Sequence, residues 1–211
     1  MSKLLSFDIK TTGADPFKHH MLAIGACLFD SETETVMSKI EYLITPGNDV
    51  VFEAKCLREF WLKDGRETLI SMLENMYQKG ITPERAIGDL VFWIEERTRD
   101  CADDTIIISD NVAYDVSWLN HYISKYSHSR PLHYIFGGKY RTIVDTYSYA
   151  SAVAQKTHSA QFDWDMNESA LEIVGEETPE ASMRTPCEGA VRIARLHSRI
   201  MRGVKKHKTK A

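Results

Sequence analysis

The stretch Leu4-Leu5-Ser6-Phe7-Asp8-Ile9-Lys10-Thr11-Thr12-Gly13 decides the fold of this chain. It begins as an apolar run, which is typical of a buried strand, and it ends in Asp-x-Lys-Thr-Thr-Gly. Residues two apart on a strand point to the same side, so Asp8 and Lys10 are expected to lie together. Two acidic groups at these positions would bind metal ions, but the second position carries a lysine. The segment therefore predicts a strand-end site with altered chemistry.

The composition is that of an ordinary globular domain. With 211 residues, of which 43% are hydrophobic and 27% charged, the chain is long enough for one domain with a sizeable core. No apolar run approaches the ~20 residues of a membrane span, and charges interrupt the N-terminal apolar stretch, so we expect neither a membrane helix nor a signal peptide. Four widely spaced cysteines without a C-x-x-C pair fit reduced thiols in an intracellular protein, cytoplasmic or nuclear.

The order of the patterns predicts the fold class. Apolar runs predict strands at 3–9, 21–30, 36–43, 106–108 and 142–144. Helical spacing and start signals such as Thr82-Pro83 predict helices at 55–79, 83–97, 115–125, 146–155, from 167 or 168 to 175, and 185–204. Antiparallel strands followed by alternating helices and strands indicate an α/β fold with a mixed β-sheet flanked by helices. We expect a single domain over 1–204 and a basic C-terminal tail over 205–211.

Four segments carry side chains suited to catalysis. They are residues 7–13, 108–115 (Ile-Ser-Asp-Asn-Val-Ala-Tyr-Asp), 144–146 (Val-Asp-Thr) and 184–190 (Arg-Thr-Pro-Cys-Glu-Gly-Ala), the last of which opens the final helix. In this order they resemble the motifs of the DnaQ-like 3′–5′ exonucleases, the DEDD superfamily with a ribonuclease-H-like fold. The resemblance extends over nearly the whole chain.

One branch of that superfamily is especially similar. Pro186, Glu188 and Ala190 match in register the last motif of a viral-type branch, and Ser109-Asp110-Asn111 also looks like that branch. This resemblance suggests viral or phage ancestry, with a virion-associated location as a further alternative.

The resemblance implies two-metal hydrolysis at the 3′ end of a nucleic acid. In such sites four carboxylates hold two Mg²⁺ or Mn²⁺ ions about 3.5–4 Å apart, and a histidine deprotonates the attacking water. Asp8 and Asp115 match two of the metal-binding carboxylates. Lys10 replaces the bridging glutamate, Arg184 stands where the general-base histidine belongs, and Gly189 stands where the fourth carboxylate belongs. We therefore expect one metal ion, held by Asp8 and Asp115, or none.

The substituted positions change the expected function. Like charges about 4 Å apart repel by ~4 kcal/mol at an effective dielectric of 20, so Lys10 and an inward-pointing Arg184 would oppose divalent ions. We expect an inactive or strongly impaired exonuclease homologue, retained as a nucleic-acid-binding or scaffolding pseudoenzyme. An active metal-dependent 3′–5′ exonuclease with an unconventional site is the alternative. A pure interaction protein without nucleic-acid contact is a weaker third hypothesis.

Single residues leave alternatives open. His158 and Asp163 also have the His-x4-Asp spacing and are a second candidate for the third motif, although Lys10 would remain. Asp115 can serve as a helix N-cap, a role that is compatible with metal binding. Asp145 is interpreted as a structural helix start.

The final helix carries a basic stripe. Arg192, Arg195, Arg199 and Arg202 recur every three or four residues on one face, and residues 184–211 hold nine Lys or Arg against one acid. A solvated face of an amphipathic helix is one interpretation. Contact with single-stranded nucleic acid or with an acidic protein surface is the other. The pattern predicts no oligomeric state.

Overall fold

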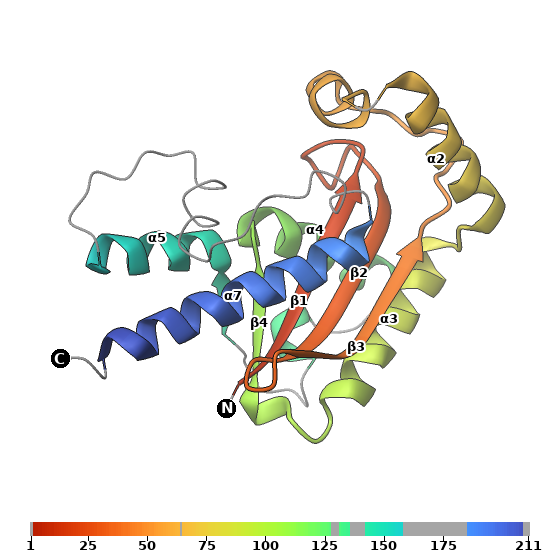
Figure 1. The fold of residues 1–211 in the computed structure, drawn as a ribbon. Helices are drawn as coiled ribbons and strands as arrows, with labels where there is room; N and C mark the ends of the chain where they lie inside the picture. Colours follow the sequence, from red (N-terminus) through yellow and green to blue (C-terminus); the bar gives the residue numbers. More distant parts are fainter. Residues whose placement is uncertain (1, 64, 128–130, 136–141, 158–184, 209–211) are drawn as a thin grey trace.

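A five-stranded mixed sheet forms the centre of the molecule (Figure 1). The computed structural model describes residues 2–63, 65–127, 131–135, 142–157 and 185–208. The strands are β1 (Lys3–Thr11), β2 (Met21–Asp30), β3 (Thr35–Leu43), β4 (Thr105–Ser109) and β5 (Ile143–Asp145), in the order β3-β2-β1-β4-β5. The first three pair antiparallel, whereas β4 lies parallel to β1 and to β5. The predicted mixed α/β sheet is confirmed.

Helices cover both faces of this sheet, and strand alternation decides which residue meets which helix. Odd-numbered residues of β1, such as Leu5 and Phe7, pack with α3 (Pro83–Thr98) and α4 (Val112–Tyr126). Even-numbered Leu4 packs with α7 (Pro186–Lys208) on the other face, which α7 crosses in Figure 1. Successive side chains on a strand point to opposite faces, so Asp8 and Lys10 share the α7 side with Leu4.

The backbone of α7 packs closely on the backbone of the sheet. Gly25 of β2 faces the backbone of Pro186 and Cys187, and a Cβ atom at position 25 would overlap those backbone atoms. Two hydrogen bonds fix the helix there: Ser6 Oγ donates to the Ala190 carbonyl at 2.6 Å, and the Cys187 amide donates to Glu41 Oε2 at 2.9 Å. The first turn of α7 is therefore anchored on β1, β2 and β3.

The single helix expected over 55–79 is wrong. The segment divides into α1 (Ala54–Cys56), the π-helix η1 (Leu57–Trp61) and α2 (Arg66–Lys79). Trp61 Nε1 donates to the Thr11 carbonyl at 2.9 Å, which ties η1 to the end of β1. Gly65 then adopts a φ of 95°, a conformation that favours glycine, and the chain changes direction before α2.

The other helix predictions agree with the described chain. Thr82 caps α3 by accepting a hydrogen bond from the Arg85 amide at 3.3 Å, as the Thr-Pro signal indicates. The remaining elements are η2 (Ala102–Asp104), η3 (Leu132–Tyr134) and α5 (Thr146–Thr157).

The final helix, expected to end at residue 204, continues to residue 208, while the short helix expected at 167–175 lies outside the described residues. The division into one domain and a tail stays a prediction. No helix in the described ranges has the length and apolar character needed to cross a membrane.

Candidate functional site

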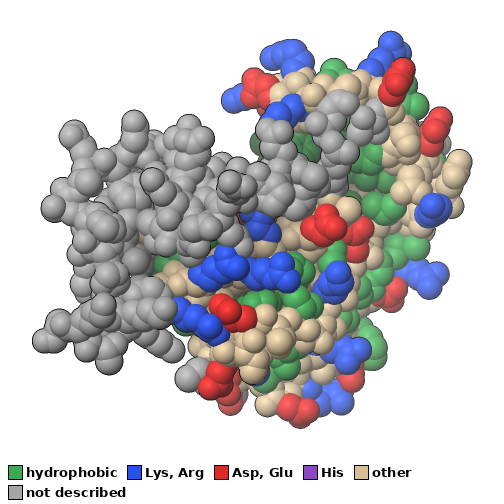
Figure 2. All heavy atoms as spheres, in the orientation of Figure 1, with side chains coloured by type: hydrophobic (Ala, Val, Ile, Leu, Met, Phe, Trp, Pro, Cys, Tyr) green, Lys and Arg blue, Asp and Glu red, His purple; other side chains and the backbone are tan. Residues whose placement is uncertain are grey.

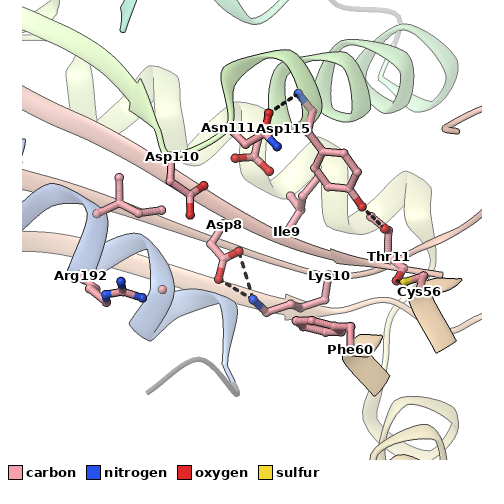
Figure 3. A pocket seen from close by; sticks show the side chains of 13 residues that line it. Asp8, Ile9, Lys10, Thr11, Cys56, Phe60, Asp110, Asn111, Asp115 and Arg192 are labelled. Atoms are coloured by element: carbon pink, nitrogen blue, oxygen red, sulfur yellow. Dashed lines mark hydrogen bonds and ion pairs between the residues drawn. The ribbon is translucent and has the colours of Figure 1, made fainter. Parts of the chain in front are cut away.

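A cavity of about 300 Å³ opens where the carboxyl ends of β1 and β4 meet α7 (Figure 3). Five charged residues from four parts of the chain line it, namely Asp8, Lys10, Asp110, Asp115 and Arg192. The carboxyl ends of parallel strands are a common location for sites in α/β sheets. The structure thus brings Asp8, Lys10 and Asp115 together, as the sequence predicts.

Lys10 forms an ion pair with Asp8 inside the cavity. Its Nζ donates to Asp8 Oδ2 at 2.9 Å and to Oδ1 at 3.2 Å, and the two side chains are only 10% and 14% exposed. The lysine ammonium also lies 5.5 Å from the centroid of the Phe60 ring. Both carboxylate oxygens of Asp8 are therefore bound by a cation that belongs to the chain itself.

Asp115 lies in the first turn of α4 and is directed at the same cavity. Ser109 Oγ donates to Asp115 Oδ2, while the N-cap of the helix is Asn111, whose Oδ1 accepts from the Tyr114 amide at 3.2 Å. The interpretation of Asp115 as the N-cap is wrong because Asn111 fills that role. The buried carboxyl group of Asp115 instead lines the cavity.

Asp110, which enters the sequence analysis only through the Ser109-Asp110-Asn111 resemblance, is a further residue of the site. It follows the last residue of β4 and lies between Asp8 and Asp115 in Figure 3. The available signal was its position directly after a buried strand, where polar side chains reach a sheet edge. Asp110 adds a third carboxylate to the cavity.

Burial controls the protonation of this cluster. It raises the pKa of Asp8 to about 6, although the ion pair with Lys10 opposes the rise. Burial, and next the charge of Asp110, raise the pKa of Asp115, and burial raises the pKa of Asp110 as well. Desolvation of neighbouring carboxylates thus favours protonated forms.

Removing the Lys10 ammonium is expected to destabilise the fold in a pH-dependent way. The folded-state pKa of Asp8 already lies above its ordinary value of 3.8, and Lys10→Met would raise it further. Below pH ~4 the carboxyl is protonated in both proteins and their stabilities should be similar. Above pH ~6 the unpaired carboxylate should cost the variant about 1–3 kcal/mol in the free energy of unfolding.

Urea unfolding at low and high pH measures this difference. Lys18→Met is the matched control, because Lys18 is 77% exposed and its ion pair with Asp15 lies at the surface. Its effect should stay within about 0.5 kcal/mol. An equal loss of stability for Lys10→Met at both pH values would contradict the role given to Asp8.

Gly189 faces Asp8 directly. A Cβ atom at position 189 would overlap Asp8 Oδ2, so the Asp8 carboxylate occupies the space that a side chain at 189 would need. Arg184, and the alternative pair His158 and Asp163, lie outside the described residues. Their roles stay predictions.

The predicted basic stripe divides into different environments. Arg192 lines the cavity and hydrogen-bonds with Tyr147, whereas Arg195 is exposed. Arg202 donates to the Ser31 and Glu32 carbonyls at 2.9 and 2.6 Å and so holds the turn between β2 and β3.

Arg199 is half-buried, and basic side chains follow the visible side of α7 in Figure 2. The bonds of Arg202 to the turn between β2 and β3 are a structural role that the sequence pattern did not indicate.

Asp145 has the structural role expected for it. Its Oδ1 accepts from the Ser148 amide at 2.7 Å at the start of α5, and its Oδ2 accepts from the Val112 amide at 3.2 Å. The side chain therefore links the first turns of two helices.

The carboxylates do not form a ready metal centre in the described chain. Among residues 2–63, 65–127, 131–135, 142–157 and 185–208, no group of three or more His, Cys, Asp or Glu is arranged to hold a metal ion. Asp8, Asp110 and Asp115 line one cavity, but the Lys10 ammonium lies against the Asp8 oxygens.

The sheet has the order β3-β2-β1-β4-β5, with one aspartate on its central strand and a second on the helix after β4, and its fold is that of the ribonuclease-H-like exonucleases. The model of the 3′–5′ exoribonuclease Rv2179c-like domain matches residues 3–178, so the chain belongs to this family. The matched range includes residues 158–163 and ends before α7.

Individual relatives agree with this assignment. The chain is 25% identical over 128 residues to the 3′–5′ DNA exonuclease Cap18 of Escherichia coli, and the match covers 60% of each chain. Cell-death related nuclease 4 (CRN-4) has a TM-score of 0.67 at 12% identity, covering 96% of this chain and 64% of that one. The nuclease domain of 3′hExo, a DEDDh family member bound to rAMP, has a TM-score of 0.60 at 12% identity, with coverages of 95% and 92%. At these identities the structures show a shared fold alone.

Proposed function

We propose that this protein binds the 3′ ends of nucleic acids as an exonuclease homologue whose hydrolytic activity is absent or strongly impaired. The observation that carries the proposal is the Lys10 ammonium, which hydrogen-bonds to both carboxylate oxygens of Asp8 inside the cavity. Those oxygens are the ones that a metal ion would need.

The donor set does not fit two divalent ions. Lys10 is hydrogen-bonded to Asp8 and places a positive charge at the position where the resemblance expects a glutamate. Residue 189 is a glycine and has no side chain to bind a metal ion. A cation about 4 Å from another is repelled by ~4 kcal/mol per unit charge at an effective dielectric of 20, and twice as much for a divalent ion. No hydrolytic step through a metal pair follows from this arrangement. Binding of Mg²⁺ or Mn²⁺ is limited to one weakly held ion or none.

Nucleic acid is the partner that the family supports best. The matching family model describes an exoribonuclease and the E. coli relative is a DNA exonuclease, so the ligand class is a nucleic-acid strand. Arg192 at the cavity and Arg195 on the exposed side of α7 supply cations for its phosphates. An acidic protein surface at the same helix is the alternative partner.

An active metal-dependent exonuclease with an unconventional site is the second candidate. Two observations favour it: the family match includes His158 and Asp163, and Asp110 adds a carboxylate beside Asp115. Both candidates fit the intracellular or virion-associated location and the viral ancestry that the sequence predicts.

One pair of assays separates the two candidates. A 5′-labelled single strand of DNA or RNA should bind in the presence of EDTA, with an affinity that falls steeply with salt. The same strands should not be shortened at a rate above background with Mg²⁺ or Mn²⁺, and Asp8→Ala should leave that rate unchanged. Metal-dependent trimming that Asp8→Ala abolishes would establish the active enzyme instead. An absence of strand binding at low salt would count against the proposed function.

A further inference from the structure

Lys10 and Arg192 place two cations around one carboxylate. Lys10 comes from β1 and Arg192 from α7, and Figure 3 shows them on either side of Asp8. An ammonium has three N–H donors, and the two bonds to Asp8 leave one of them for a ligand. Arg192 hydrogen-bonds with Tyr147 and its charge acts on Asp110, and its planar guanidinium suits the oxygens of a phosphate.

The position of the ammonium is chemically informative. In two-metal hydrolysis the ions that are bound by the carboxylates are also the groups that contact the phosphate. Here the ammonium of Lys10 is bound by Asp8. The contact with phosphate can therefore pass from a metal ion to a charge-assisted N–H donor.

The surroundings of the two cations fit a nucleotide better than a bare anion. Phe60 presents a ring that is 43% exposed next to the Lys10 ammonium, and such a face can stack with a base. The cavity of about 300 Å³ is at the lower limit of small-ligand sites. Lys10 also lines a second, wider groove of about 890 Å³ beside α2. A ligand that contacts Lys10 in the cavity can therefore extend into this groove.

We propose that this cavity holds the phosphate of a nucleotide directly between Lys10 and Arg192, without a divalent ion. The inference rests on the proposed function and specifies how a strand end is held. Asp110 is the opposing charge, because it faces the same cavity, whereas Asp115 is only 4% exposed and accepts the Ser109 hydroxyl.

Isothermal titration in EDTA tests this directly, with AMP, adenosine and inorganic phosphate as the probes. AMP should bind at least about tenfold more tightly than adenosine or inorganic phosphate, since only AMP offers both the phosphate and the base. Lys10→Met and Arg192→Met should each weaken AMP binding by about tenfold or more, and Asp110→Asn should tighten it. Arg85→Met is the matched control, because Arg85 lies on α3, is 71% exposed and pairs with Asp89.

The outcomes are distinguishable from those of the proposed function. Equal affinity for AMP and adenosine, AMP binding that requires Mg²⁺ or Mn²⁺, or tight AMP binding in both methionine variants would overturn the inference. If a single strand binds in EDTA but AMP does not, the proposed function stands and this inference fails. If AMP binds in EDTA and strands do not, the inference stands and the strand-binding function fails.

Discussion

The triple variant Lys10→Glu, Gly189→Asp and Arg184→His is expected to gain Mn²⁺-dependent 3′–5′ exonuclease activity, at least about a thousandfold above the wild-type chain. The three changes return two carboxylates and a general base to the positions that the family resemblance assigns to them. A thousandfold increase corresponds to a reduction of about 4 kcal/mol in the activation free energy, which is modest for a restored two-metal site.

The geometry around Asp8 explains why these changes should act together. The Asp8 carboxylate fills the space next to Gly189, where any Cβ would overlap it, and Lys10 holds it there. Gly189→Asp alone therefore meets a clash, whereas Lys10→Glu removes the partner that keeps Asp8 in this position. Activity and stability should be strongly non-additive between positions 10 and 189, as is usual for residues in contact.

The single variant Lys10→Glu separates two placements of the third motif. If His158 and Asp163 supply that motif, which lies inside the family match over 3–178, Lys10→Glu alone should restore much of the activity. If α7 supplies it, the single variant should stay inert and only the triple variant should act. Initial rates on a 5′-labelled single strand measure both, with Asp8→Ala in the triple background as the negative control. A folded but inert triple variant would show that α7 is not the third motif.

Gly25→Ala is expected to lower the free energy of unfolding by about 3 kcal/mol, the upper part of the range for overpacked positions. The added Cβ would overlap the backbone of Pro186 and Cys187, and a backbone cannot move aside as a flexible side chain can. The first turn of α7 would have to leave the sheet, at the expense of its hydrogen bonds to Ser6 and Glu41.

Gly88→Ala is the matched control, because a Cβ at position 88 on α3 meets no atom within 4 Å. This change should stabilise the protein by about 0.5–1 kcal/mol, since alanine favours a helix interior more than glycine does. Urea denaturation curves of both variants measure the difference. A Gly25→Ala protein as stable as wild type would mean that α7 does not pack on β2 as closely as described.

Gly25 also connects the stability of the fold to the site. Gly25 pairs with Asp8 across the β1–β2 ladder, and Gly189 and Arg192 lie on α7. A displaced α7 would therefore move these two residues away from the Asp8 carboxylate. AMP binding in EDTA should weaken in Gly25→Ala even under conditions where the variant remains folded.

Features that depend on local pattern could be predicted from the sequence. Alternation on β1 indicates that Asp8 and Lys10 share a face, because the geometry of a single strand suffices. The Thr82-Pro83 signal at the start of α3 is equally local.

Features that depend on distant partners could not be predicted in this way. The segment before α2 is held to the end of β1 by the bond of Trp61 to the Thr11 carbonyl, a contact between residues 50 positions apart. The contribution of Asp110 and the structural use of Arg202 likewise depend on where β4 and α7 lie in space. Helical spacing alone describes a face, whereas the neighbours of that face come from the tertiary structure.

The way in which Asp8 fills the volume beside Gly189 makes the present site hard to change by single mutations. An acidic side chain introduced at 189 first meets a steric clash, and a glutamate introduced at position 10 first adds an unpaired charge to a buried carboxylate cluster. Each single step leads through a less stable protein, and only the combined change relieves both problems. Selection for stability alone would therefore entrench the lysine and the glycine as a pair.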